Sequence, residues 1–163
     1  MTVMYVRRSA RVAVLDAEDR VLLLHARFRR SVPGVDLAWF LPGGGVEHNE
    51  DLTAAAVREL AEETGIAVDQ TSLTALAHTE GDGTVGELTG PMRDDVFVTR
   101  APSTAVSTAG MEEHERRALD RHRWWPLAAL ADTDEMVFPV GLAAVLRDFT
   151  AAHCWPDPRQ LPW

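Results

Sequence analysis

The sequence has 163 residues, 46% of them hydrophobic, and a formal net charge of −9 at pH 7. This length and apolar content predict one globular domain, residues 1–163, with a buried core. The acidic balance argues against RNA or DNA as a partner, since such binding normally uses a basic face that neutralises many phosphates. A small phosphorylated ligand is compatible with the charge, because bound divalent cations reverse the local field of an acidic pocket.

Cysteine content and hydropathy indicate a cellular location. Cys154 is the single cysteine, so the sequence offers no intramolecular disulfide and no cysteine-rich zinc site. Arg7, Arg8 and Arg11 interrupt the apolar N-terminal segment, and no apolar run approaches the length of a membrane span. We therefore expect a cytoplasmic protein with no membrane partner.

Three short apolar segments near the N-terminus predict strands. Segments 11–16 and 21–25 flank a polar stretch and predict an antiparallel hairpin. Residues 29–38 follow without clear periodicity. Segment 39–41 predicts a third strand, which runs into a glycine-rich loop at Pro42.

The next segment predicts a helix from Asn49 to about Thr64. Asn49 is a favourable N-cap, and Glu50 and Asp51 place negative charge in the first turn, where the helix dipole favours it. Gly65 is expected to end the helix. One buried face is predicted from the apolar residues that recur every three or four positions. These are Ala54, Val57, Leu60 and Ala61.

The second half of the chain alternates predicted strands with irregular segments. Strands are expected at 72–80, 96–99 and 123–126, with long polar loops at 81–95 and 101–111 between them. The helical segments expected here are a turn at 127–130 and an amphipathic helix at 140–153. The order of elements predicts an α/β fold in which a mixed β-sheet lies between helices.

One glycine motif in this half is interpreted as structural. Gly81, Gly83 and Gly86 spell G-x-G-x-x-G, the dinucleotide-binding fingerprint. No helical pattern follows the motif, and Gly90 with Pro91 interrupts the chain soon afterwards. We therefore interpret the segment as a mobile hairpin loop in a position to form part of a substrate mouth.

Three carboxylates on the predicted central helix carry the chemical argument. Glu59, Glu62 and Glu63 fall within about one turn on one helix face. Like charges placed so destabilise a helix by roughly 0.2–0.5 kcal/mol per pair, unless cations lie between them. Carboxylate oxygens are ligands that suit Mg²⁺ or Mn²⁺. The alternative is an ordinary solvated acidic face.

The surrounding spacing favours the metal hypothesis. Gly44 is followed after five residues by Glu50, and after seven more by the run R-E-L-A-E-E-T-G-I at 58–66. All specified positions of the Nudix box match over this 23-residue segment, so the chain resembles the MutT-like Nudix hydrolases. The resemblance implies the Nudix fold and metal-dependent hydrolysis of a phosphoanhydride bond in a nucleoside diphosphate linked to another moiety.

The resemblance also implies roles for individual residues. The residues expected to bind Mg²⁺ or Mn²⁺ are Glu59, Glu62 and Glu63. The Gly43 carbonyl is expected to complete the coordination, and Arg58 and Glu50 to organise the carboxylates. Glu59 or Glu63 is expected to contact the attacking water. A homodimer is common in the family and is a further expectation.

A fourth carboxylate is expected from a later loop, as the resemblance implies. Glu115 is the candidate, and Glu112, Glu113 and Asp95 compete with it. A solvated surface for the acidic run 112–115 is the alternative interpretation.

Residues that contact the substrate are less well indicated. Trp39 is the candidate for stacking on a base, although aromatic residues of short strands are commonly core residues. Arg29 is the candidate cation for a distal phosphate, with a solvated loop as its alternative. Nucleoside triphosphates, modified nucleotides and nucleotide sugars all remain open as substrates.

Subfamily markers and the single cysteine limit other functions. Gly81 stands where a proline would resemble ADP-ribose hydrolases, and there is no tyrosine there to indicate a dinucleoside polyphosphate. A non-catalytic nucleotide-sensing Nudix module is the alternative function, which the intact box carboxylates disfavour. An isoprenoid diphosphate isomerase would need a core cysteine, and Cys154 lies too close to the C-terminus.

Overall fold

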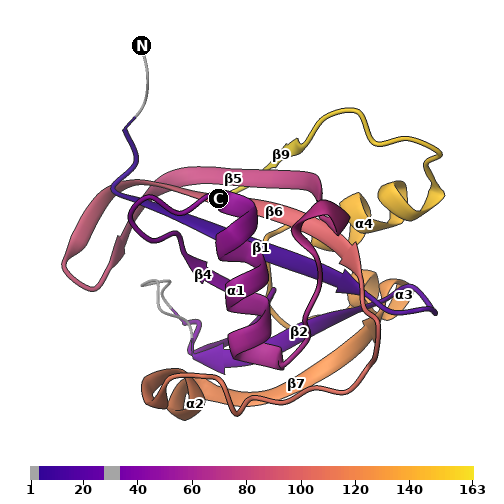
Figure 1. Ribbon diagram of the computed structural model, residues 1–163, viewed down its shortest axis with the longest axis horizontal. Coiled ribbons are helices and arrows are strands. Elements are labelled where there is room, and N and C mark those ends of the chain that lie inside the picture. Colours follow the sequence, from indigo (N-terminus) through magenta and orange to yellow (C-terminus); the bar gives the residue numbers. More distant parts are fainter. Residues whose placement is uncertain (1–3, 28–33) are drawn as a thin grey trace.

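A computed structural model describes residues 4–27 and 34–163 of the protein (Figure 1). Within these residues one mixed sheet of nine strands carries the fold. The strands are β1 (Arg7–Leu15), β2 (Arg20–Arg27), β3 (Leu37–Phe40), β4 (Gly43–Gly45), β5 (Thr74–Val85), β6 (Leu88–Arg100), β7 (Leu119–Pro126), β8 (Val137–Phe138) and β9 (Arg159–Leu161). The helices are α1 (Leu52–Thr64), α2 (Glu113–Ala118), α3 (Leu127–Asp132) and α4 (Leu142–Ala151), with a 3-10 turn, η1, at Gln70–Ser72.

The sheet follows the order β8-β3-β2-β1-β6-β5-β9, and β4 and β7 pair with β1 and β2 away from this path. β1 and β6 are parallel, as are β3 with β8 and β5 with β9, whereas the other pairs are antiparallel. The structure thus confirms the predicted mixed sheet and the predicted β1–β2 hairpin.

The central strand β1 is apolar from Val12 to Leu15, where both of its faces are buried. Ala13 and Leu15 face a core that includes residues of α3 and α4. Val12 and Val14 point to the other side, into a core with α1. Figure 1 shows α1 crossing in front of β1, so helices cover the sheet on both faces, as predicted.

Helix α1 begins later than predicted. Asn49 is not the N-cap, because it has a left-handed backbone with a φ of 63° and lies in the turn closed by the Glu50 N–H and the Glu47 carbonyl. The N-cap is Asp51, so the acidic first turn is not formed as predicted. The C-terminal prediction is confirmed, since Gly65 has a φ of 71° and its N–H bonds the Ala61 carbonyl.

The buried face of α1 is also rotated from the predicted one. Ala61 is exposed, whereas Ala55, Ala56, Glu59 and Leu60 are buried. Apolar periodicity failed here because the buried side of α1 includes Glu59, a carboxylate that a count of apolar residues assigns to solvent.

The predicted loop at 81–95 is wrong. β5 and β6 continue through this segment as one long hairpin, and Val85 pairs with Leu88 across a two-residue turn. Gly86 has a φ of 61°, as such turns require. The polar composition misled the prediction because backbone hydrogen bonds and cross-strand ion pairs, such as Arg93 with Glu80, hold the hairpin.

None of the helices in the described part of the chain is long and apolar enough to cross a membrane.

Candidate active site

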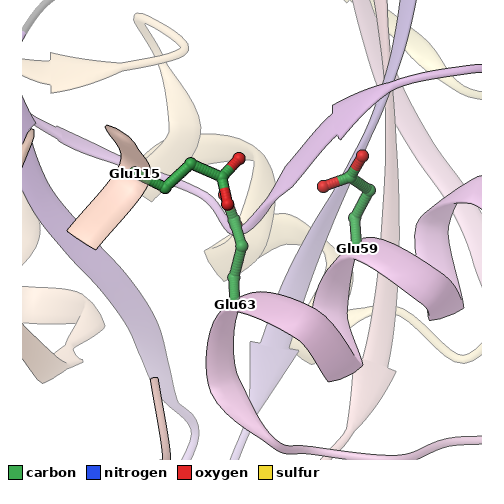
Figure 2. A group of neighbouring side chains, drawn as sticks. All are labelled: Glu59, Glu63 and Glu115. Atoms are coloured by element: carbon green, nitrogen blue, oxygen red, sulfur yellow. The ribbon is translucent and has the colours of Figure 1, made fainter. Parts of the chain in front are cut away.

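Three carboxylates meet at one place although they come from two helices. Glu59 and Glu63 are four residues apart on α1 and project from the same side of it. Glu115 reaches them from α2, and one oxygen of each residue lies within 4.8 Å of the others. Figure 2 shows the Glu115 carboxylate beside that of Glu63, with Glu59 one helical turn away. Hard oxygen donors grouped in this way fit Mg²⁺ or Mn²⁺.

The glycines of β4 bring backbone into contact with the carboxylates. The Gly43 N–H donates a 2.7 Å hydrogen bond to Glu63 Oε2. Gly43 has a φ of 139°, and a Cβ there would lie 2.1 Å from the Ala10 carbonyl oxygen. A Cβ at Gly44 would lie 2.6 Å from the carboxylate atoms of Glu59. Glycine is therefore needed for β4 to fit between β1 and α1.

Arg58 fixes the orientation of the neighbouring acids. Its Nε and Nη2 donate to the two oxygens of Glu50 at 2.8 and 2.9 Å. Its Nη1 donates to Glu59 Oε1 at 2.9 Å, and Nη2 also donates to the Gly45 carbonyl at 3.1 Å. Because the guanidinium is planar and held on several sides, it holds the Glu59 carboxylate in place.

Glu62 lies apart from the three-carboxylate group, contrary to the predicted convergence of Glu59, Glu62 and Glu63. Its side chain is 48% exposed, and Arg58 Nη1 donates to it at 3.2 Å. The physical reason is its angular position, since the buried face of α1 passes through Glu59 and Glu63 and leaves position 62 at the solvent edge.

A loop packed on the end of α1 positions Glu115. The Ser107 N–H donates to the Thr64 carbonyl at 2.8 Å. A Cβ at Gly110 would lie 2.6 Å from the Glu62 carbonyl oxygen, so the loop backbone lies directly against the helix. This contact brings α2, which follows the loop, to the same end of α1.

Glu112, Glu113 and Asp95, the alternative candidates for the fourth carboxylate, do not join Glu59 and Glu63. Glu112 and Glu113 have side chains 75% and 72% exposed. Asp95 is bound by Arg8 at 2.7 Å and by Arg93 at 2.8 Å, away from the carboxylate group. Glu115 is thus the later carboxylate that the fold brings to Glu59 and Glu63, as the sequence predicted.

The carboxylate group lines a cavity of about 200 Å³. Arg11 of β1 also lines it and donates a 2.5 Å hydrogen bond from Nη1 to the Gly43 carbonyl. Other lining residues form an apolar wall contributed by several strands. They include Phe40, Leu41, Val85, Met92, Phe138 and Trp163.

The family model described as NUDIX domain matches residues 6–146 of the sequence. The chain belongs to the Nudix family. The RNA pyrophosphohydrolase of Dinoroseobacter shibae is 39% identical over 69 residues, which cover 42% of this chain and 40% of that protein. The match therefore spans less than half of the length of this relative.

Solved structures support the Nudix fold. A MutT Nudix hydrolase from Burkholderia pseudomallei superimposes with a TM-score of 0.59 at 24% identity, over 86% of this chain and 95% of that one. The Nudix domain of Shewanella oneidensis NrtR, solved in complex with ADP ribose, gives a TM-score of 0.62 at 18% identity, over 92% and 90%. The fold prediction is confirmed.

Burial changes the protonation of the Nudix carboxylates in the metal-free protein. Burial raises the pKa of Glu63 to about 7, against the opposing effects of Arg11 and the Gly43 N–H. Burial likewise raises the pKa of Glu59 above its ordinary value, although Arg58 opposes the shift. By contrast, the hydrogen bonds from Arg58 lower the pKa of Glu50 to about 2. Glu59 and Glu63 are therefore destabilised as anions unless a cation joins them.

The prediction that Trp39 stacks on a base is wrong. Trp39 is 1% exposed, and its ring packs between His25 and Trp125 at centroid distances of 4.6 and 5.2 Å. Its indole N–H donates to Glu135 at 2.8 Å. The residue is core because it faces α3 and α4 rather than the cavity. Arg29 lies outside the described residues, so its proposed phosphate contact stays a prediction.

The sequence did not indicate the roles of Arg11, Phe138 and Trp163 in the cavity. Arg11 had a local indication, because it is a charged residue within the otherwise apolar run 10–15. Phe138 and Trp163 had none. They reach the cavity through strand pairings with residues far away in the sequence, β8 with β3 and β9 with β5.

Proposed function

We propose that this Nudix protein is a divalent-metal-dependent hydrolase that cleaves a phosphoanhydride bond in a small nucleoside diphosphate derivative. The observation that carries the proposal is the meeting of Glu59, Glu63 and Glu115 inside a cavity that also has an apolar wall. Carboxylates grouped and partly buried in this way are unfavourable as anions without a cation. The substrates considered are nucleoside triphosphates, modified nucleotides and nucleotide sugars.

The three grouped carboxylates would hold the ion. When bound, Mg²⁺ or Mn²⁺ supplies neutralisation of the diphosphate oxygens and lowers the pKa of coordinated water. The Gly43 carbonyl is a further candidate donor, because its hydrogen bond from Arg11 occupies one of two lone pairs. Glu62 stays a candidate only for the outer edge of the site.

The chain's own residues prepare the reaction in separate ways. Arg58 holds Glu59, and the Gly43 N–H holds one oxygen of Glu63. Both acids are placed to accept a proton from an attacking water. Arg11 puts a positive charge beside Glu63, where the substrate phosphates would approach.

The charge of the protein and the names of its relatives support a nucleotide substrate. The net charge of −9 favours a small substrate over an RNA chain. The matched D. shibae relative is named as an RNA pyrophosphohydrolase, and the NrtR domain was solved with ADP ribose. Both names refer to a compound that contains a nucleotide and a phosphoanhydride bond, and this is the class of substrate that we propose here.

The test is a hydrolysis assay on a panel of nucleotides. We would incubate the protein with Mg²⁺ or Mn²⁺ and nucleoside triphosphates, nucleotide sugars, ADP-ribose or 5′-triphosphorylated RNA, and measure the release of phosphate or pyrophosphate. We expect metal-dependent turnover of a small nucleotide. Glu63→Gln should lower kcat/KM by about 100-fold or more, because it removes a carboxylate from the metal group.

Glu113→Gln is the matched control, since Glu113 lies exposed on α2 beside Arg117 and outside the carboxylate group. This variant should retain activity within about twofold. The proposal fails if no panel member is hydrolysed with either metal, or if Glu63→Gln is as active as the parent protein. Metal-dependent nucleotide binding without turnover would instead support the nucleotide-sensing alternative.

A further inference from the structure

The first two glycines of the G-x-G-x-x-G motif, Gly81 and Gly83, lie on strand β5 and contact Trp163. Gly81 and Gly83 are two residues apart and therefore face the same side of the strand. A Cβ at Gly81 would lie 2.1 Å from Cγ and Cδ1 of Trp163, and one at Gly83 would lie 3.4 Å from Cζ2. The indole therefore rests directly on the β5 backbone, in space that a side chain at Gly81 would occupy.

The register of β9 places Trp163 on these glycines. β9 pairs in parallel with β5, and Leu161 lies opposite Thr79. Two residues further along both strands, Trp163 comes level with Gly81. Its Nε1 donates a 3.0 Å hydrogen bond to the Asp82 carbonyl. Figure 1 shows β9 beside β5 and the C-terminal end of the chain close to β5.

Three contacts of residues that precede Trp163 anchor the segment that carries it. Arg159 Nη1 bonds Asp148 of α4 at 2.5 Å, and its guanidinium lies 4.6 Å from the ring centroid of Trp155. The Trp155 indole N–H donates to the Leu76 carbonyl of β5 at 3.2 Å. The position of Trp163 is thus fixed by the fold on both sides of β9.

Trp163 lines the same cavity as Glu59, Glu63 and Glu115. It comes from the β5–β9 edge of the sheet path, whereas Phe40 and Phe138, which stack at 5.8 Å, come from the β3–β8 edge. The curled sheet thus brings aromatic rings from both edges to one cavity. A ligand held by its phosphates at the carboxylates would place its remaining part among these rings.

We propose that Trp163, seated on Gly81 and Gly83, is a specificity-determining residue that binds the nucleobase of the substrate by stacking. This inference rests on the proposed function, and it adds the residue that holds the base of the substrate. The indole N–H is bonded to the Asp82 carbonyl. The ring therefore recognises a base through its π-face, which tolerates different bases.

The test compares ligands with and without a base. Trp163→Ala should raise KM for a nucleoside triphosphate by about 10-fold, while kcat changes by less than about threefold. The inhibition constant of inorganic tripolyphosphate, which has no base, should stay unchanged. Trp163→Phe should restore most of the nucleotide affinity because it keeps an aromatic face. The loss should be similar for adenine and guanine nucleotides.

Gly81→Ala tests the contact between the Trp163 indole and the β5 backbone without altering the tryptophan. Gly81 has no left-handed backbone, so alanine is restricted there by its contact with Trp163 and not by its own conformation. This variant should reproduce the KM increase of Trp163→Ala and add little to it in the double variant. Gly83→Ala is the matched control on the same face, since its Cβ would lie 3.4 Å from the indole and 3.3 Å from Sδ of the flexible Met92 side chain. It should change KM by less than about twofold.

Gln160→Ala controls for a general effect of altering this segment, because Gln160 is exposed on β9 and does not line the cavity. The proposal is overturned if Trp163→Ala leaves nucleotide KM unchanged, or if it weakens nucleotide and tripolyphosphate equally. Calorimetric binding with Ca²⁺ separates the two proposals. Trp163-dependent nucleotide binding without turnover would contradict only the hydrolase, and turnover independent of Trp163 would contradict only this inference. Absence of both binding and turnover would contradict both.

Discussion

The two sides of the cavity are built on different length scales. The carboxylate side comes mainly from residues 43–63, where β4 and α1 follow each other in the chain and local spacing fixes the geometry. The aromatic side combines Phe40, Phe138 and Trp163, which are far apart in the sequence. Most of the carboxylate geometry is therefore encoded locally, with Glu115 as the long-range exception, whereas the shape that receives the rest of the ligand depends on long-range pairing.

The largest expected effect would come from disturbing the local side. Gly44→Ala would place a Cβ 2.6 Å from the Glu59 carboxylate, so the carboxylate must leave the position in which Arg58 holds it. We expect kcat/KM and metal affinity to fall by about 100-fold, with a folded circular dichroism spectrum. Gly45→Ala is the control, since its Cβ would lie 3.7 Å from the nearest Arg7 atom and should be tolerated. Equal losses of kcat/KM and metal affinity in both variants would contradict a specific role for the contact between Gly44 and the Glu59 carboxylate.

A smaller effect is expected on the free energy of unfolding, because the buried Glu63 carboxylate is unfavourable as an anion in the metal-free protein. Because burial raises the pKa of Glu63 from 4.5 to about 7, the folded protein binds more protons than the unfolded chain between these values. The free energy of unfolding of the metal-free protein should therefore fall as pH rises from about 4.5 to 7, by on the order of 1–3 kcal/mol. Below this window Glu63 makes no such unfavourable contribution.

Chemical denaturation at several pH values, with and without Mg²⁺, measures this effect. Saturating Mg²⁺ should reduce the decline, because the bound cation favours the ionised carboxylates. Glu63→Gln should flatten the profile in the metal-free protein. A parent profile that rises over the same pH range would contradict the proposed strain.

The smallest expected effect tests whether Trp39 belongs to the core or to the cavity wall. Trp39→Phe removes the indole hydrogen bond to Glu135 and some packing against Trp125. The free energy of unfolding should fall by about 1 kcal/mol, since one partly buried hydrogen bond is lost. Nucleotide KM should stay the same, because Trp39 does not line the cavity. An increase in KM comparable to that of Trp163→Ala would contradict this assignment and indicate that Trp39 contacts the substrate.

Prediction from the sequence was most successful where one element decided the outcome. The helix end at Gly65 and the β1–β2 hairpin were expected, and both depend on a few neighbouring residues. The joining of Glu115 to Glu59 and Glu63 was expected through family resemblance rather than through any local pattern. The continuation of β5 and β6 through residues 81–95 was missed, although a hairpin loop was expected there, because its stability comes from backbone pairing that composition does not reveal.

Burial was the second limit of sequence-based prediction. Trp39 and Trp163 are the same residue type, and neither local sequence indicates which one is covered. In the fold Trp39 is 1% exposed between β2 and the helices, whereas Trp163 lines the cavity. Glu62 and Glu63 are adjacent, yet only Glu63 belongs to the carboxylate group, because the buried side of α1 depends on where β4 packs.

Short-range spacing was enough to predict the Nudix box, a helix that carries Glu59, Glu62 and Glu63, and the glycines that precede this helix. Only the fold shows that Glu62 stays outside the carboxylate group, that Arg11 lies beside Glu63, and that Trp163 rests on Gly81 and Gly83 of β5. The physical reason is that these contacts depend on strand register and on packing between distant segments, and neither leaves a periodic pattern in the residues concerned.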